Sequence, residues 1–387
     1  MSKKRSTIFN FRPTKLFTEF FESEKAGGMI LMFCTLVSLA LVNSAWGHDY
    51  LSFFHIQIGP HPLEFWINDG LMAIFFLLVG LELEREIYIG ELSNLKKALL
   101  PMFAALGGMI VPACIYLGIN FGLPTSSGSG IPMATDIAFA LGILSLLGKR
   151  VPASLKVFLT ALAVIDDLGA IIVIAFFYTK GLVVSNLLIS LGIFAGLLLL
   201  NRLKVKILSI YLIAGVFMWY FMLKSGVHAT ITGVLLAFAI PFQNGGEDSI
   251  SYKLQHFLHK PVAFFILPLF ALANTAILIK GNISSFIFEP YALGIFFGLF
   301  LGKPIGISLF SYLVIKLKIC VLPGDIKFNS IIGLGFLGGI GFTMSIFITL
   351  LAFNDAAIIN DAKLMILIAS LCASIFGFFL LKLALKD

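Results

Sequence analysis

The chain has 387 residues, of which 59% are hydrophobic and only 12% are charged. Soluble globular domains do not have this composition, so residues 1–387 are expected to form one polytopic, all-α integral membrane domain. The formal net charge of +7 does not indicate a nucleic-acid partner, because the basic residues are scattered along the chain in small groups. The four cysteines lack metal or redox spacing and are expected to be small buried hydrophobes.

The first 25 residues are polar and basic, which indicates a cytoplasmic N-terminal segment. The apolar stretch at 26–43 is longer than the core of about 7–15 residues in a signal peptide, so we expect it to remain as the first span. Residues 46–65 alternate around Gly59 and Pro60, which predicts a small β-hairpin in a periplasmic loop. An exposed hairpin can pair with a second copy of itself.

Eleven further apolar stretches predict twelve transmembrane helices in total. If the N-terminus is inside, the inner segments contain 22 Lys and Arg residues and the outer segments contain four. Basic residues concentrate on the cytoplasmic side of membrane proteins, so both termini are predicted to be cytoplasmic. Most basic residues are thereby explained by topology.

Two spans, centred near residues 136 and 341, contain Gly and Pro or several Gly residues in their middle. These residues free backbone polar groups, which only a buried or water-lined site can satisfy. Each span is the second in a run of three, one run in each half of the chain. Interrupted spans at corresponding positions are typical of inverted-repeat transporters. Close packing of ordinary helices through small residues is the alternative.

Asp166 and Asp167 stand side by side in the apolar stretch from Val157 to Tyr178. An ionised Asp at the bilayer centre costs about 2.5–3.5 kcal/mol, so this pair predicts an ion or proton site, with a buried structural hydrogen-bond pair as the alternative. Counting along the spans places Asp136 and Lys303 at the same depth. Because adjacent helix positions differ by about 100°, one of the two neighbouring acids is expected to face a cavity, while the other lies at its edge or pairs with the lysine.

Carboxylates crowded into one site titrate as a coupled group, and a deprotonated pair also suits a hard cation such as Na⁺ or Li⁺. Thr135 lies beside Asp136 in the interrupted span, where Asp136 and Lys303 can offset the partial charges of half-helix ends. A site that holds either protons or a cation, and opens to one side at a time, belongs to an exchanger rather than to an enzyme.

Three other classes of protein use intramembrane charges. An intramembrane aspartyl protease needs its two acids on separate helices, and here they are adjacent. A cation channel favours rings of charge and weak binding at several sites. A sodium-coupled symporter of similar architecture does not require the Asp pair or the lysine. The channel and the symporter remain the alternatives to an exchanger.

The second span ends in a charged group that consists of Glu82, Glu84, Arg85 and Glu86. The simplest interpretation is a solvated helix end. Asp69 lies near the outer end of the same span, where it can cap or line the helix. His228 stands at the outer start of the eighth span, where it is more simply an interfacial residue, although histidine can sense pH.

Six stretches resemble the NhaA-type sodium/proton antiporters, in the right order and over nearly the whole chain: residues 75–82, 134–140, 164–168, 225–230, 301–304 and 338–345. The resemblance implies twelve helices with an inverted repeat, in which the fourth and eleventh helices are broken and cross each other. It also implies electrogenic export of Na⁺ or Li⁺ in exchange for H⁺, without a cofactor, for pH and sodium homeostasis. A homodimer formed through the 46–65 hairpin in the lipid of the bacterial inner membrane is implied as well.

The resemblance also implies the roles of single residues. Asp166 and Asp167 are expected to bind the cation and the protons, with Asp167 the more indispensable. Lys303 is expected to pair with one of them and join the proton cycle, while Asp136 and Thr135 balance charge at the crossing. Positions tied to pH activation correspond to Glu82, Arg85, Glu86, His228, Gln255 and His256.

One position departs from the family's pattern. Gln255, next to His256, stands where the family has an acid that belongs to the pH-sensing cluster. Because an amide does not titrate, we expect the pH response of this protein to be shifted or shallower.

Overall fold

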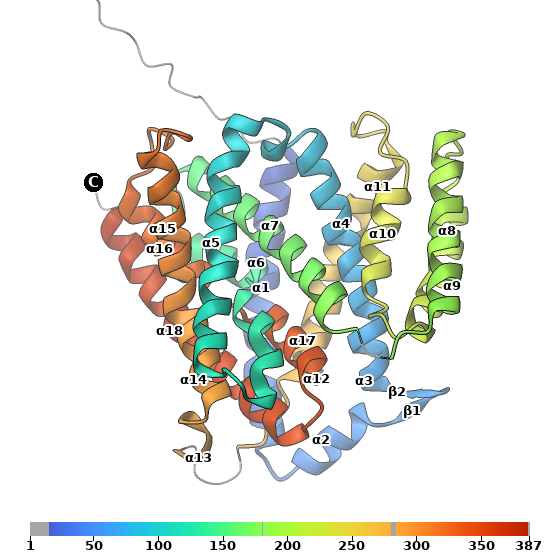
Figure 1. The fold of residues 1–387 in the computed structure, drawn as a ribbon, viewed down its shortest axis with the longest axis horizontal. Coiled ribbons are helices and arrows are strands. Elements are labelled where there is room, and N and C mark those ends of the chain that lie inside the picture. The colour runs from blue at the N-terminus through green and yellow to red at the C-terminus, as the bar shows by residue number, and fades with distance from the viewer. Residues whose placement is uncertain (1–14, 180, 280–283, 386–387) are drawn as a thin grey trace, which may run out of the picture.

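The computed structural model describes residues 15–179, 181–279 and 284–385; residues 1–14 of the predicted N-terminal segment lie outside this part. The described chain forms a bundle of helices lying side by side, with a small strand pair at one end (Figure 1). We call the end with the strand pair the hairpin end. The opposite end, where the last helix finishes, is called the terminal end.

The helices of the first half begin and end as follows: α1 (Lys15–Val42), α2 (Gly47–Phe54), α3 (Leu63–Phe65), α4 (Met72–Tyr88), α5 (Leu95–Ile119), α6 (Ile137–Ser145), α7 (Ala153–Phe177), α8 (Val184–Arg202) and α9 (Leu208–Lys224). Those of the second half are α10 (Ile231–Ala239), α11 (Ile250–Pro261), α12 (Leu267–Asn274), α13 (Ser284–Ile287), α14 (Pro290–Phe297), α15 (Lys303–Lys316), α16 (Phe328–Gly338), α17 (Phe342–Ala352) and α18 (Ala356–Ala384). Wider π-helical turns join three pairs of these helices, at Trp66–Leu71, Val262–Ile266 and Gly298–Gly302.

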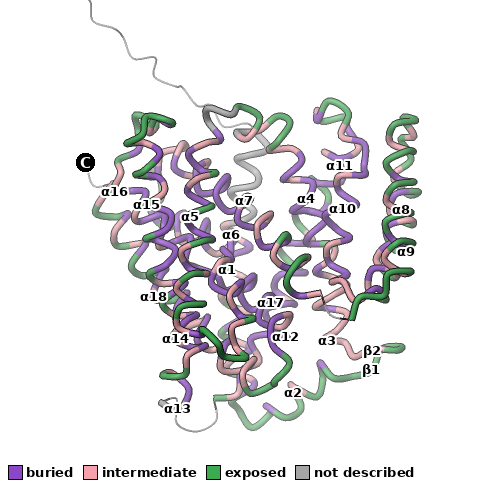
Figure 2. The backbone as a smooth tube through the Cα atoms, viewed as in Figure 1, coloured by how far each residue is buried: buried purple, intermediate pink, exposed green. Residues whose placement is uncertain are grey.

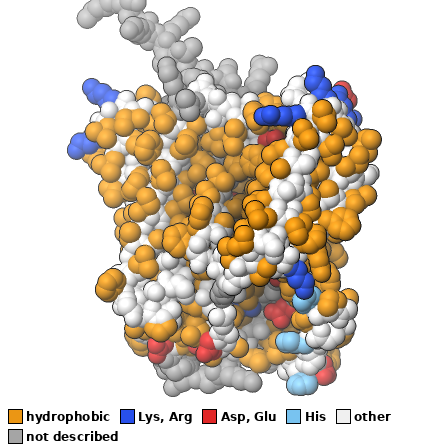
Figure 3. Space-filling model, turned by 45° about the vertical axis from the view of Figure 1, so that its right-hand side comes forward, with side chains coloured by type: hydrophobic (Ala, Val, Ile, Leu, Met, Phe, Trp, Pro, Cys, Tyr) orange, Lys and Arg blue, Asp and Glu red, His pale blue; other side chains and the backbone are white. Residues whose placement is uncertain are grey.

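By length and composition, eight helical stretches of the described chain can cross a membrane. Two bent pairs of shorter helices raise this number to ten. Helix α9 is apolar but has only 17 residues, and α10 has nine. The structure therefore has a polytopic helical fold, while the count of twelve spans stays a prediction. Figure 3 agrees with a membrane setting, because hydrophobic side chains cover the middle of the face shown and most Lys and Arg gather near its upper end.

The loop at 46–65 differs from the expected hairpin over much of its length. Helix α2 occupies residues 47–54, and the antiparallel strands β1 (Gln57–Ile58) and β2 (His61–Pro62) are each only two residues long. Gly59 forms the turn with φ +66°, a conformation that favours glycine. Alternation of apolar and polar residues indicated a strand before the turn, but the eight residues from Gly47 to Phe54 form a short helix along the surface.

The two bent pairs interrupt their spans where glycine and proline gather. Residues Pro124–Met133 form a 3₁₀ helix, residues 134–136 are extended, and α6 begins after a bend of 42°. In the other pair, α16 ends at Gly338, and α17 begins at Phe342 after a bend of 46°. Proline lacks the backbone donor that a helix needs, and glycine weakens helix interiors, so both sequences favour a break.

Small residues bring the neighbouring helices close to these breaks. A side chain on Gly306 of α15 would run into the backbone of Gly107 in α5, and one on Gly233 would run into the backbone of α4. Gly28 of α1 packs against the backbone at Ala138 in the same way. Figure 2 shows the result: buried residues fill the middle of the bundle, while α8 is largely exposed and α9 is exposed in part. The interrupted segments therefore lie in the interior.

Candidate functional site

Lys303 and Asp166 form a fully buried ion pair between α15 and α7. The Nζ atom of Lys303 lies 2.5 Å from Oδ2 of Asp166 and 2.9 Å from the hydroxyl of Thr135. That hydroxyl lies 2.8 Å from the same carboxylate oxygen and 2.8 Å from the backbone carbonyl of Gly338. A hydroxyl has a single hydrogen to donate, so Thr135 accepts from Lys303 and donates to one of these two oxygens. The group joins both interrupted segments to α7 and α15.

Asp136 lies between the N-termini of α6 and α17. Its Oδ1 atom accepts from the backbone N–H of Phe139 at 2.9 Å, as an N-cap of α6. Its Oδ2 atom accepts from Thr343 twice, at 3.1 Å from the backbone N–H and at 2.5 Å from the hydroxyl. The backbone N–H of Asp136 donates to the carbonyl of Ile340 at 2.7 Å. A helix N-terminus carries partial positive charge, so one buried carboxylate neutralises two such ends.

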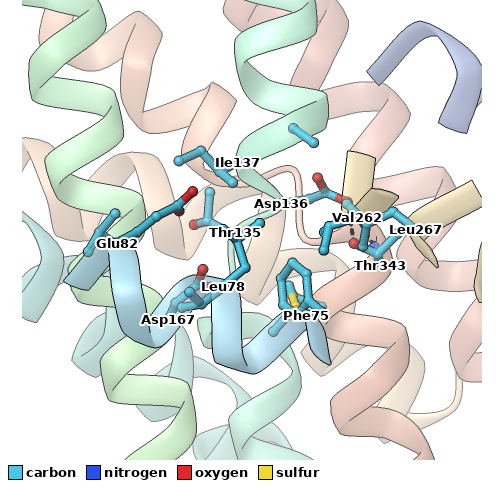
Figure 4. A pocket seen from close by; sticks show the side chains of 14 residues that line it. Phe75, Leu78, Glu82, Thr135, Asp136, Ile137, Asp167, Val262, Leu267 and Thr343 are labelled. Atoms are coloured by element: carbon cyan, nitrogen blue, oxygen red, sulfur yellow. Dashed lines mark hydrogen bonds between the residues drawn. The ribbon is translucent and has the colours of Figure 1, made fainter. Parts of the chain in front are cut away.

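Asp167 faces a pocket rather than the lysine (Figure 4). Its side chain is buried, and its Oδ1 atom has no hydrogen-bond partner among the residues that the structure describes. Thr135 and Asp136 border the same pocket, and Glu82 borders it from α4. The other lining residues are largely apolar: Phe75, Leu78, Val79, Ile137, Ala138, Val164, Val262, Leu267, Thr343 and Met344.

The pocket extends from Asp167 toward the terminal end. It borders α4 from Phe75 to Glu82, which corresponds to about 10 Å along the helix axis at 1.5 Å per residue. Helix α4 finishes six residues beyond Glu82, at the terminal end. The cavity volume of about 30 Å³ is enough for one or two water molecules beside an acid. Adjacent acids thus have different surroundings: one is bonded to a lysine, and the other borders a space.

Several residues that the resemblance ties to pH activation gather where α4 meets α11. Nε2 of His259 lies 3.4 Å from Oε1 of Glu82. The guanidinium of Arg85 lies 5.0 Å above the ring of Tyr252, which stacks on His256 with 6.3 Å between ring centroids. Gln255 is buried on the same helix, and Glu86 follows on α4 half-buried.

Three predicted residues have other surroundings. His228 lies 3.0 Å from the backbone carbonyl of Tyr178, just beyond the end of α7 and away from this group. Asp69 lies in the π turn before α4, where its backbone carbonyl accepts from Trp219 at 3.2 Å. Glu84 is only 4% exposed, so the interpretation of a solvated helix end is wrong for it. It follows Gly80 by one turn, on the face that packs against α10.

Sequence reasoning did not select three of the partners. Thr343, His259 and the carbonyl of Gly338 contact Asp136, Glu82 and Thr135 respectively. His259 stands four residues after Gln255, and this helical spacing was a usable signal, because residues at i and i+4 share a face. Nothing in the sequence beyond the glycine cluster itself indicated that the carbonyl of Gly338 contacts Thr135.

The fold and the site together define an integral membrane protein of the transporter type, with broken helices and buried charges at its centre. The chain matches the Na⁺/H⁺ antiporter 1 family over residues 18–381, and it belongs to that family. It is 67% identical over 374 residues to the Na(+)/H(+) antiporter NhaA of Flavobacterium psychrophilum, with 97% of each chain covered. It is 60% identical to the NhaA of Cytophaga hutchinsonii, with the same coverage, and 58% identical to that of Dechloromonas aromatica, covering 94% of this chain and 95% of the relative.

A solved structure has the same overall fold. The sodium proton antiporter MjNhaP1 from Methanocaldococcus jannaschii superimposes with a TM-score of 0.54 at 14% sequence identity, covering 96% of this chain and 98% of the other. At that identity the likeness concerns the fold alone. The family membership rests on the curated relatives, which are transporters and not enzymes.

Proposed function

We propose that this protein exchanges Na⁺ for H⁺ across a membrane, at a site centred on Asp167. The observation that carries the proposal is a buried carboxylate with an unbonded oxygen that borders a pocket, next to a second carboxylate already neutralised by a lysine. A carboxylate in such a place gains either from a proton or from a cation. Names of the relatives support the same exchange.

Competition between the two ligands makes the site an exchanger. When Asp167 is protonated it carries no charge and no longer offers Na⁺ a carboxylate ligand. When it is deprotonated, the nearby oxygens of Thr135 and Asp136, together with water in the pocket, complete the shell that a hard cation needs. Because only one ligand is bound at a time, each passage of Na⁺ in one direction is coupled to passage of H⁺ in the other. Li⁺ has the same charge and preference for oxygen, so we include it among the substrates.

Lys303 and Asp166 extend the proton cycle beyond a single acid. If Na⁺ draws Asp166 into its shell, the salt bridge opens and the ammonium of Lys303 loses its counter-charge. Release of a proton from Lys303 then relieves the burial of an isolated charge. Counting this proton with that of Asp167, more than one H⁺ moves per Na⁺, which makes the exchange electrogenic.

Sidedness and assembly complete the proposal. The excess of Lys and Arg in the predicted inner segments supports an orientation in a bacterial inner membrane with the terminal end in the cytoplasm and the hairpin end in the periplasm. The extension of the Asp167 pocket toward the terminal end supports an inward-facing conformation. The strand pair, in which β1 is exposed and β2 is half-buried, is proposed to pair with its copy in a homodimer. The residues around Glu82 and His259 are proposed to adjust the activity to pH.

Reconstitution into liposomes with an internal pH dye tests the exchange. Addition of Na⁺ should dissipate a preformed proton gradient for the parent protein. The Asp167→Asn variant should show no response, because an amide neither binds H⁺ nor neutralises Na⁺. The matched control is Asp325→Asn, which changes an acid that bonds Ser154 near the terminal end. A persistent response in Asp167→Asn, or an equal loss in Asp325→Asn, would remove the proposed role.

A further inference from the structure

Two closed layers separate the pocket from the hairpin end. The first, which we call the phenylalanine layer, consists of Phe76, Phe270 and Phe347. The ring of Phe347 lies 5.5 Å from that of Phe76 and 6.4 Å from that of Phe270, and all three are fully buried. Aromatic rings cannot replace the water shell of a cation, and rings packed in this way leave no room for a hydrated one, so the layer blocks passage.

The second, which we call the amide layer, consists of Asn68, Asn274 and Lys363. The amide nitrogen of Asn274 donates to Oδ1 of Asn68 at 2.7 Å, and that of Asn68 donates back at 3.4 Å. Nζ of Lys363 donates to Oδ1 of Asn274 at 3.5 Å. The same Asn274 nitrogen lies 3.0 Å from the carbonyl of Phe270, which links the two layers.

The order of these layers follows from positions along the helices. On α12, Leu267 borders the pocket, Phe270 follows one turn later and Asn274 follows one turn after that. On α17, Met344 borders the pocket and Phe347 is three residues farther toward the hairpin end. Both α12 and α17 therefore pass from the pocket to the layers in the direction of the hairpin end.

Both layers are divided between the same two pairs of helices. Phe347 and Lys363 belong to α17 and α18, which only three residues connect. The other four members belong to α12, to α4 and to the π turn that precedes α4. Helix α17 also bears Thr343, which bonds Asp136, so a shift of α17 acts on the site and on the phenylalanine layer together. Amides and an ammonium can exchange their mutual bonds for water when they separate, which keeps such an opening reversible.

We propose that the phenylalanine layer and the amide layer form the outer gate of the transporter, and that the contact between Lys363 and Asn274 is the latch that holds it closed. Opening consists of α17 and α18 moving away from α4 and α12. This inference rests on the proposed function, because it describes how the site of Asp167 opens toward the hairpin end. It adds the residues that must separate before Na⁺ can leave at the hairpin end.

Cross-linking tests the latch in a background in which Cys34, Cys114, Cys320 and Cys372 are replaced by alanine. The pair Asn274→Cys with Lys363→Cys is joined by a short bis-methanethiosulfonate reagent in liposomes. We expect loss of Na⁺/H⁺ exchange on joining and recovery on reduction. The control pair, Asn43→Cys with Ile279→Cys, joins α1 to the chain after α12 at the same end without crossing the gate, and it should retain exchange. Equal rates of Na⁺/H⁺ exchange before and after cross-linking of the latch pair would rule out the proposed gate.

A second measurement does not depend on activity. The cysteine in Leu267→Cys borders the pocket and reports whether a membrane-impermeant thiol reagent reaches it from the hairpin end. Adding Phe347→Ala should accelerate this labelling, whereas adding Phe265→Ala, which removes an exposed ring nearby, should not. Equal labelling rates in the two variants overturn the gate. The parent protein is assayed for exchange in parallel: failure of the parent rejects the proposed function, and a parent that exchanges with unaffected gate variants rejects the gate alone.

Discussion

Asp166 and Asp167 are neighbours in the chain, but they belong to two different regions of the site. Asp166 has a lysine and a threonine on one oxygen, within a network that joins four segments of the fold. Each acid has one buried oxygen without a described hydrogen-bond partner, but Asp167 borders the pocket and Asp166 does not. A rotation of about 100° along α7 is enough to direct the two acids differently. We call the side of Asp166, with its lysine and threonine, the bonded side, and the side of Asp167, with the pocket, the open side. The difference supports the proposal that one acid of the pair stabilises the site, while the other binds an exchangeable ligand.

The largest effect on stability is expected on the bonded side. Lys303→Ala leaves Asp166 as an uncompensated buried charge, which costs about 3–5 kcal/mol when one partner of a buried pair is removed. The thermal midpoint in detergent should fall markedly, and Asp166→Asn added to Lys303→Ala should restore part of it. Asp167→Asn should leave the midpoint unchanged or raise it. A similar fall in Lys303→Ala and Asp167→Asn would erase the distinction between the two sides.

A smaller loss of stability is expected at Asp136, where the two interrupted spans meet. Thr343→Val removes the hydroxyl that donates to Asp136 but keeps the backbone donor, so the expected cost is that of one hydrogen bond to a charged group, about 1.5–3 kcal/mol. Thr343→Ser restores the hydroxyl and should recover most of the midpoint. If serine and valine destabilise equally, the hydroxyl is not what stabilises the crossing.

The smallest effect concerns the pH response of the open side. Gln255 is buried on α11, four residues before His259, which lies against Glu82 at the border of the pocket. Gln255→Glu adds a titratable group there, and we expect the curve of exchange activity against pH to shift or steepen. The shift is a change of midpoint and not of maximal rate, because the variant leaves Asp167 untouched. Superimposable curves for the two proteins would show that this position has no part in the pH response.

Much of the fold could be predicted from patterns within single segments. Apolar length predicted the spans, clusters of glycine and proline predicted the breaks near 136 and 341, and the two bent pairs confirm those breaks. The local pattern was misleading for α2, where alternation of apolar and polar residues suggested a strand. Alternation favours a strand only where neighbouring strands pack against it, and a short surface segment lacks them.

The pairing within the site could not be predicted in the same way. Helical periodicity shows that Asp166 and Asp167 point in different directions, but not which direction faces Lys303, which is 137 residues away from its partner. That choice depends on how α15 and α7 each pack against α5, and the backbone contact between Gly107 and Gly306 brings α5 and α15 close together. The burial of Glu84 could not be predicted either, since it lies one turn after Gly80, where α10 approaches α4 closely.

Proton release on addition of Na⁺ tests the central claim most directly. The purified protein is held in lightly buffered detergent solution near neutral pH, and a pH dye records the change when NaCl is added, with choline chloride as the control salt. If Na⁺ and H⁺ compete for the open side, the parent protein releases protons and Asp167→Asn releases fewer or none, although it remains folded. Equal release from the parent and from Asp167→Asn would contradict the account, because the exchangeable proton would then belong to another group.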